Sequence, residues 1–183
     1  MKNIIAYYKM IDEKRITEAR NNFEKYLEEG FIKKSYNQTA QDIFFKNAYD
    51  SLKASQILLE NKIPLWTIVS SYYAMFYMAN SVLLKLGYKT GDKIVHKVTA
   101  DALIYIIRPK LKKQILEDYE EIKEQALQIA EIKSDELVLN FDYERNKRNY
   151  IQYQTAKQDI RNKAKTSLSR AKEFLFEMEK LLK

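Results

Sequence analysis

Cysteine is absent from the 183-residue sequence, and histidine occurs once, as His96. Disulfides, thiolate metal sites and metal sites built on a pair of histidines are therefore excluded, and we expect no metal and no other cofactor. Three glycines and two prolines leave few positions for turns, which favours long helices over sheets. Phosphate-binding loops with several glycines at fixed spacing are excluded for the same reason. The lack of cysteine is consistent with a cytoplasmic location.

The longest uncharged run, residues 63–84, has the length of a membrane-spanning helix. Polar side chains such as Thr67, Ser71 and Asn80, together with three tyrosines, reduce its preference for lipid. We therefore interpret this run as a buried helix and expect no membrane association. A membrane span is the less favoured alternative.

The spacing of apolar residues predicts six helical segments with links between them. They cover approximately residues 11–29, 39–61, 64–87, 94–107, 110–132 and 156–182. We predict an all-α fold: an antiparallel up-and-down helical bundle over residues 38–183, preceded by a helical extension over residues 1–37. The segment from 64 to 87 is expected to be the most buried, as marked by Trp66, Val69, Tyr73, Phe76, Leu83 and Leu86. Residues 31–38 and 88–93 are expected to be connectors.

Positive charge is concentrated near the C-terminus. Between Arg145 and Lys172 nine basic residues are opposed only by Asp159, so this segment carries a net charge of +8 while the whole chain carries +7. Such a segment is typical of a surface that binds phosphate groups. The alternative is a solvated helix face that offsets the acidic stretch 117–136.

Residues 145–153, with the sequence RNKRNYIQY, combine three cations, two asparagines and two tyrosines. Arginine presents a planar fork to phosphate oxygens, and tyrosine offers a ring for base stacking. In the helix that follows, the cations lie on a different face from the apolar stripe. We therefore predict nucleic-acid contacts by four residues: Arg148, Tyr153, Lys157 and Arg161. The alternative is a helix end that is capped by asparagine and covered by tyrosine.

Two further features have more than one interpretation. His96 could act as a general acid or base, although a single histidine at the start of a helix is more often structural. The aromatic stretch 70–77, with the sequence SSYYAMFY, could be core packing, or it could line a subunit interface or a ligand cleft.

Several of these residues together resemble the HEPN superfamily. The resemblance covers roughly residues 40–183 and is carried by the Trp66-to-Tyr77 stretch, by His96, by Arg145 with Tyr150, and by the spacing Ala48–Leu52–Ala54–Leu58. It implies a helical bundle that forms a homodimer, with a cleft where the two arginine motifs meet. Many members of the superfamily are metal-independent ribonucleases, often toxins paired with a small nucleotidyltransferase-like antitoxin.

The family's motif is an arginine, usually a polar residue next, and a histidine four to six residues after the arginine. Arg145 and Asn146 match the first two positions, but Tyr150 stands where histidine is expected. A tyrosine with the ordinary pKa of about 10 is only ~0.1% deprotonated at pH 7, so it is a poor base. The resemblance therefore implies that Arg145 stabilises a phosphate, that Asn146 orients it, and that Tyr150 donates a hydrogen bond or stacks. We expect an RNA-binding protein or ribonuclease of a toxin–antitoxin type; the alternative is a non-catalytic nucleotide-binding or protein-interaction module.

Overall fold

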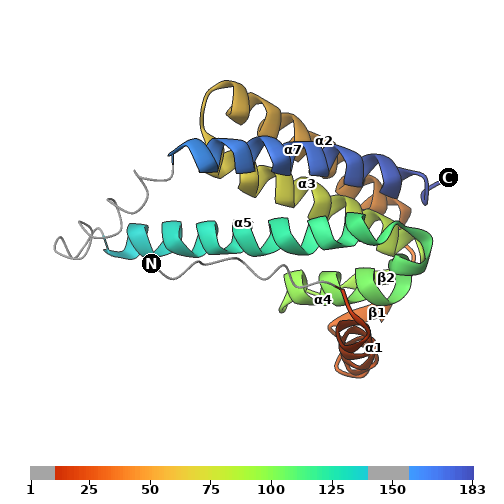
Figure 1. The fold of residues 1–183 in the computed structure, drawn as a ribbon. Helices are drawn as coiled ribbons and strands as arrows, with labels where there is room; N and C mark the ends of the chain where they lie inside the picture. Colours follow the sequence, from red (N-terminus) through yellow and green to blue (C-terminus); the bar gives the residue numbers. More distant parts are fainter. Residues whose placement is uncertain (1–10, 140–156) are drawn as a thin grey trace.

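The computed structural model describes residues 11–139 and 157–183, apart from the side chains of 131–139, 157 and 158. Within these residues, long helices form an antiparallel bundle in which α2 and α5 run in one direction and α3 and α7 in the other (Figure 1). The predicted all-α up-and-down bundle is thus confirmed. In chain order the elements are α1 (Glu13–Glu28), β1 (Ile32–Lys34), α2 (Gln38–Glu60), α3 (Pro64–Lys85), β2 (Tyr88–Thr90), α4 (Val95–Ala102), a π-helical turn η1 (Leu103–Ile107), a 3-10 turn η2 (Arg108–Lys110), α5 (Lys113–Leu139) and α7 (Lys157–Glu179).

The central helix is α3, which contacts α2, α4, α5 and α7. Pro64 occupies its first turn, where the missing N–H is not needed. Most of its side chains are buried, as predicted for the uncharged run, and no helix of the described residues is long and apolar enough to cross a membrane. Trp66 was expected in the core but is 46% exposed, because the face that it shares with Ser70, Tyr73 and Tyr77 is only partly covered.

Small and hydroxylic residues line the contact between α2 and α3. The Ser55 hydroxyl lies 2.7 Å from that of Ser71 and donates to the carbonyl of Thr67 at 3.0 Å. Further along, the Ser81 hydroxyl donates to the carbonyl of Gln41 at 3.1 Å. These bonds satisfy buried polar groups while the small side chains let the two helices approach closely. The two helices therefore form one tight hairpin.

A two-stranded antiparallel sheet joins β1 and β2, with Ile32 opposite Thr90. Residues 31–38 and 88–93 were predicted to be connectors, because strands of three residues are too short to show an alternation of apolar and polar residues. Gly30 ends α1 with φ +75°, and Gly87 follows α3 with φ +85°. Glycine adopts these left-handed angles without the steric cost of a side chain. Each glycine thereby directs the chain from a helix into a strand.

The N-terminal helix α1 packs against α4 and η1, and its Ala19, Phe23 and Tyr26 belong to the same core as the bundle. The Asp12 carboxylate caps it by accepting the N–H of Arg15 at 2.8 Å. Residues 1–37 were expected to be an extension to a bundle formed by 38–183. The described part of this segment shares its core with that bundle.

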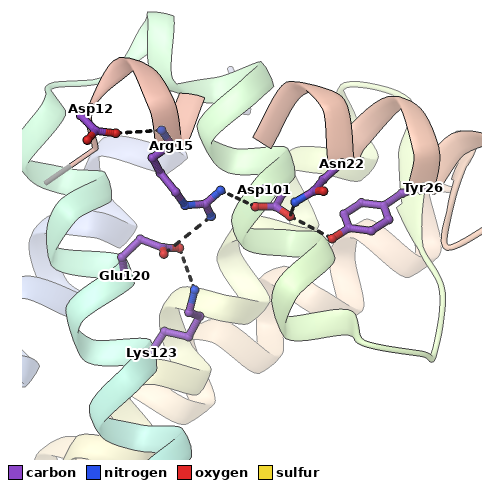
Figure 2. Close-up of polar contacts among 7 residues, drawn as sticks. All are labelled: Asp12, Arg15, Asn22, Tyr26, Asp101, Glu120 and Lys123. Atoms are coloured by element: carbon purple, nitrogen blue, oxygen red, sulfur yellow. Dashed lines mark hydrogen bonds and ion pairs between the residues drawn. The ribbon is translucent and has the colours of Figure 1, made fainter. Parts of the chain in front are cut away.

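A buried polar network holds α1 against α4 (Figure 2). The Arg15 guanidinium lies 2.6 Å from the Asp101 carboxylate, and only 11% and 1% of the two side chains are exposed. Asn22 Nδ2 and the Tyr26 hydroxyl donate to the same carboxylate, at 3.0 and 2.9 Å. On α5, Glu120 lies 3.8 Å from Arg15. Because an unpaired buried carboxylate is costly, this network explains how the core accommodates Asp101.

Candidate nucleic-acid interface

The residues predicted to form the site fall mostly in the part of the chain that the structure does not describe. Five of them lie outside the described residues: Arg145, Asn146, Arg148, Tyr150 and Tyr153. Lys157 begins α7, but its side chain also lies outside the described part. Arg161, one turn further along, is described and exposed. The structure therefore places one end of the predicted surface.

Helix α7 separates apolar from basic side chains. The core accommodates its apolar stripe, which consists of Ala164, Leu168, Ala171, Leu175 and Met178. Arg161, Lys165 and Lys172 are exposed on another side of the helix. The two-sided character predicted for this helix is confirmed. Because the apolar face of α7 is packed against the core, the positions of the cations on its basic face are fixed.

Arg161 and Lys165 share a pocket with a cation that the sequence did not single out. The pocket has a volume of about 210 Å³ and is lined by Leu59, Glu60, Lys62, Pro64, Arg161 and Lys165. Lys62 comes from the turn between α2 and α3, about a hundred residues before α7. Three basic residues and one acidic residue therefore line one pocket at this end of the bundle. Only the fold brings the turn and α7 together, so spacing along the sequence gives no signal for Lys62.

The backbone of the α2–α3 turn is satisfied internally. The N–H of Lys62 donates to the carbonyl of Leu59 at 3.1 Å, and that of Ile63 donates to the carbonyl of Leu58 at 2.8 Å. Lys62 has a left-handed backbone with φ 60°. Since these amides are used within the turn, they are not available to a ligand in the pocket, and Lys62 is the basic residue that the turn contributes to its lining.

Two residues of the basic segment, Lys163 and Arg170, pair with acidic residues. The Arg170 guanidinium lies 3.0 Å from the Asp118 carboxylate and 2.6 Å from that of Glu121, both on α5. Lys163 lies 2.9 Å from Asp159, one turn away on α7. The alternative interpretation, in which the basic segment offsets the acidic stretch, therefore applies to Arg170. Arg161 and Lys165 instead line the pocket.

The only histidine has a structural environment. His96 lies in the first turn of α4, with its Nδ1 2.7 Å from the Tyr72 hydroxyl and its ring centroid 4.8 Å from that of Phe76. Burial, and then the positive charge of Lys123, lower the pKa of His96. Burial raises the pKa of Tyr72 above its ordinary value, so this hydroxyl keeps its proton. We assign Tyr72 as the donor to Nδ1, which leaves the proton of the neutral imidazole on Nε2.

Among the described residues, no cluster of histidine and carboxylate side chains could hold a metal ion. Comparisons with curated proteins and with solved structures find no match. The model of the HEPN domain family matches residues 41–181, which is well over half of the chain. The match begins in the first turn of α2, extends past the end of α7 and leaves α1 and β1 outside. The chain therefore belongs to the HEPN domain family, as the sequence had indicated.

Proposed function

We propose that this HEPN protein binds RNA through the basic side of α7, with Arg161 and Lys165 among its contacts. The observation that carries the proposal is the convergence of these two cations with Lys62 on one pocket at the start of α7. The adjoining segment 145–153 adds three more cations in the sequence. Such a concentration of charge attracts phosphates at long range and releases counterions on binding. Membership of the HEPN family supports a function connected with nucleic acids.

Salt dependence tests this proposal. Affinity for a single-stranded RNA should fall linearly with salt on a log–log scale, and the slope should lose about 0.7 for each phosphate contact removed. The double variant Arg161→Gln/Lys165→Gln should therefore bind more weakly and have a slope shallower by about 1.4. The matched control is Lys14→Gln/Lys34→Gln, which removes two exposed cations from α1 and β1 on the opposite side of the molecule (Figure 1). Absence of binding at low salt, or equal slopes for the two double variants, would refute the proposal.

We further propose that the arginine motif acts on the bound RNA. Arg145 would stabilise negative charge that develops on a phosphate, and Asn146 would orient that phosphate. Tyr150 would act as a hydrogen-bond donor or a stacking ring. Arg145→Ala should abolish cleavage of total RNA and weaken binding by about 1–3 kcal/mol. Tyr150→Phe keeps the ring and removes only the hydroxyl. If this variant still cleaves RNA, Tyr150 acts by stacking. If it binds RNA but no longer cleaves it, the hydroxyl has a chemical role.

A non-catalytic nucleotide-binding or protein-interaction module is the second candidate. It is favoured by the position of His96, whose Nδ1 is occupied by Tyr72, and by the tyrosine at position 150 of the motif. RNA binding without cleavage by the wild-type protein would select this candidate. Cleavage that depends on Arg145 would reject it.

The proposed partners are a second copy of the chain and a nucleotidyltransferase-like antitoxin. The partly uncovered face of α3, with Trp66, Tyr73 and Tyr77, supports a homodimer, since a two-fold contact would cover it from both subunits. A monomer in sedimentation at tens of micromolar would contradict this. For the toxin–antitoxin role in the cytoplasm, expression of the chain alone should arrest the growth of the host cells. Coexpression with a nucleotidyltransferase encoded by a neighbouring gene should restore growth. Normal growth in the first culture would exclude the role.

A further inference from the structure

The pocket at the start of α7 has a charge that matches a particular form of phosphate. Lys62, Arg161 and Lys165 contribute three positive charges and Glu60 one negative charge, which leaves a net charge of +2. A phosphodiester within an RNA chain carries one negative charge. A phosphate monoester carries about −1.5 to −2 at pH 7. The pocket therefore matches a monoester more closely than a diester.

The size of the pocket also indicates that it holds a single phosphate group. Its volume of about 210 Å³ is below the range of roughly 300–1,000 Å³ that is usual for sites enclosing a whole small molecule. Since water occupies about 30 Å³ per molecule in the liquid, the pocket has room for a phosphate and a part of the attached sugar. A complete nucleotide would extend beyond it. We therefore expect only the phosphate end of a ligand to enter the pocket.

The donors of the pocket differ in geometry. Arg161 can contact two phosphate oxygens with its planar fork, while Lys62 and Lys165 act as point charges. A terminal phosphate has three non-bridging oxygens, and an internal phosphodiester has two. The apolar walls formed by Leu59 and Pro64 offer no competing hydrogen bond. The number of basic residues that line the pocket, three, thus equals the number of non-bridging oxygens on a terminal phosphate.

From the charge, the size and the donors together we infer that this pocket binds the terminal phosphate of an RNA. This inference rests on the proposed RNA binding and adds which part of the RNA the pocket recognises. An RNA with a phosphate at one end would dock that end between α7 and the α2–α3 turn, while the cations elsewhere on the chain contact its backbone. Glu60 limits the positive charge of the pocket and so favours a single phosphate group.

Three RNAs of one short sequence test the inference: one with a 5′-phosphate, one with a 3′-phosphate and one with hydroxyls at both ends. An internal fluorophore allows fluorescence anisotropy to measure each affinity. We expect one of the phosphorylated RNAs to bind about tenfold more tightly than the unphosphorylated one, the low end for a charge-assisted hydrogen bond. Lys62→Gln should weaken the binding of this phosphorylated RNA more than that of the unphosphorylated one, and should thereby remove the preference. Glu60→Gln should increase the preference.

Lys34→Gln is the matched control, since Lys34 is an exposed lysine on β1 and should keep the wild-type preference. All four changed positions, Glu60, Lys62, Lys165 and Lys34, are exposed, and circular dichroism can confirm that each variant folds. Equal affinity for the three RNAs would overturn the inference and leave RNA binding intact. A preference that survives in both Lys62→Gln and Lys165→Gln would also overturn it, because the phosphate would then bind elsewhere. Absence of binding by all three RNAs would overturn both proposals.

Discussion

Replacing Arg15 by methionine would leave the buried carboxylate of Asp101 without its cation. Burial acts to lower the pKa of Arg15, but the charges of Asp101 and Glu120 outweigh it and raise this pKa. The guanidinium therefore stays charged in the core. Breaking a buried pair by removing one partner typically costs about 3–5 kcal/mol. Because Asn22 and Tyr26 still donate to Asp101 in the variant, we expect the low end, about 3 kcal/mol.

Urea denaturation measures this loss directly, and a thermal melt should show a decrease of about 6–12 °C for a chain of this length. Arg20→Met provides a matched control on the same helix. Arg20 pairs with Glu24, but 63% and 57% of the two side chains are exposed, so this change should cost less than about 0.5 kcal/mol. The comparison removes the general effect of replacing arginine by methionine in α1.

A double variant tests the assignment of the effect to this pair. Asp101→Asn removes the charge of the partner, so Arg15→Met/Asp101→Asn should be destabilised by clearly less than the sum of the single changes. Additive costs, or a loss for Arg15→Met no larger than that for Arg20→Met, would refute the reasoning. Either result would mean that the contact between α1 and the bundle does not depend on this ion pair.

Two further predictions concern stability. The pKa of His96 is lower in the folded protein than its ordinary value of about 6.5 in the unfolded chain. Between these two pKa values the unfolded chain binds more protons than the folded protein. The free energy of unfolding should therefore decrease as the pH falls below about 6.5. Urea midpoints at pH 7.5 and 5.5 should show a larger loss for the wild type than for His96→Gln, and equal losses would exclude the effect. Gly30→Ala should destabilise the protein by about 1–2 kcal/mol, because alanine is strained at φ +75°. A melting temperature unchanged from the wild type would contradict this.

The parts of the fold that follow from local patterns were predicted correctly. The 3.6-residue period of α7 separates Leu168 and Leu175 from Arg161 and Lys165, and this period is a property of the helix itself. The absence of charge over residues 63–84 indicated the buried helix for a similar reason, since only a core or a membrane accepts so long an apolar segment. Such features need no knowledge of which elements are neighbours.

Features that depend on distant contacts were not predictable in this way. Lys62 lies in a turn without a motif, and only the packing of α7 makes it part of a pocket. Asp101 appears in the sequence as one acidic residue in a helix, and its partner Arg15 is 86 positions away. Trp66 was assigned to the core as part of the apolar segment 64–87, but burial depends on whether a neighbour covers that face of α3.

The exposed position of Trp66 has a spectroscopic consequence. It is the only tryptophan among 14 tyrosines and 8 phenylalanines, so emission excited at the red edge of the absorption band comes from this indole alone. Trp66 belongs to the first turn of α3, at the end of the bundle away from α1 (Figure 1). Detachment of α1 would thus lower the helical ellipticity and leave the indole emission unchanged. Coincident transitions of the two signals would instead show that α1 and the bundle unfold as one cooperative unit.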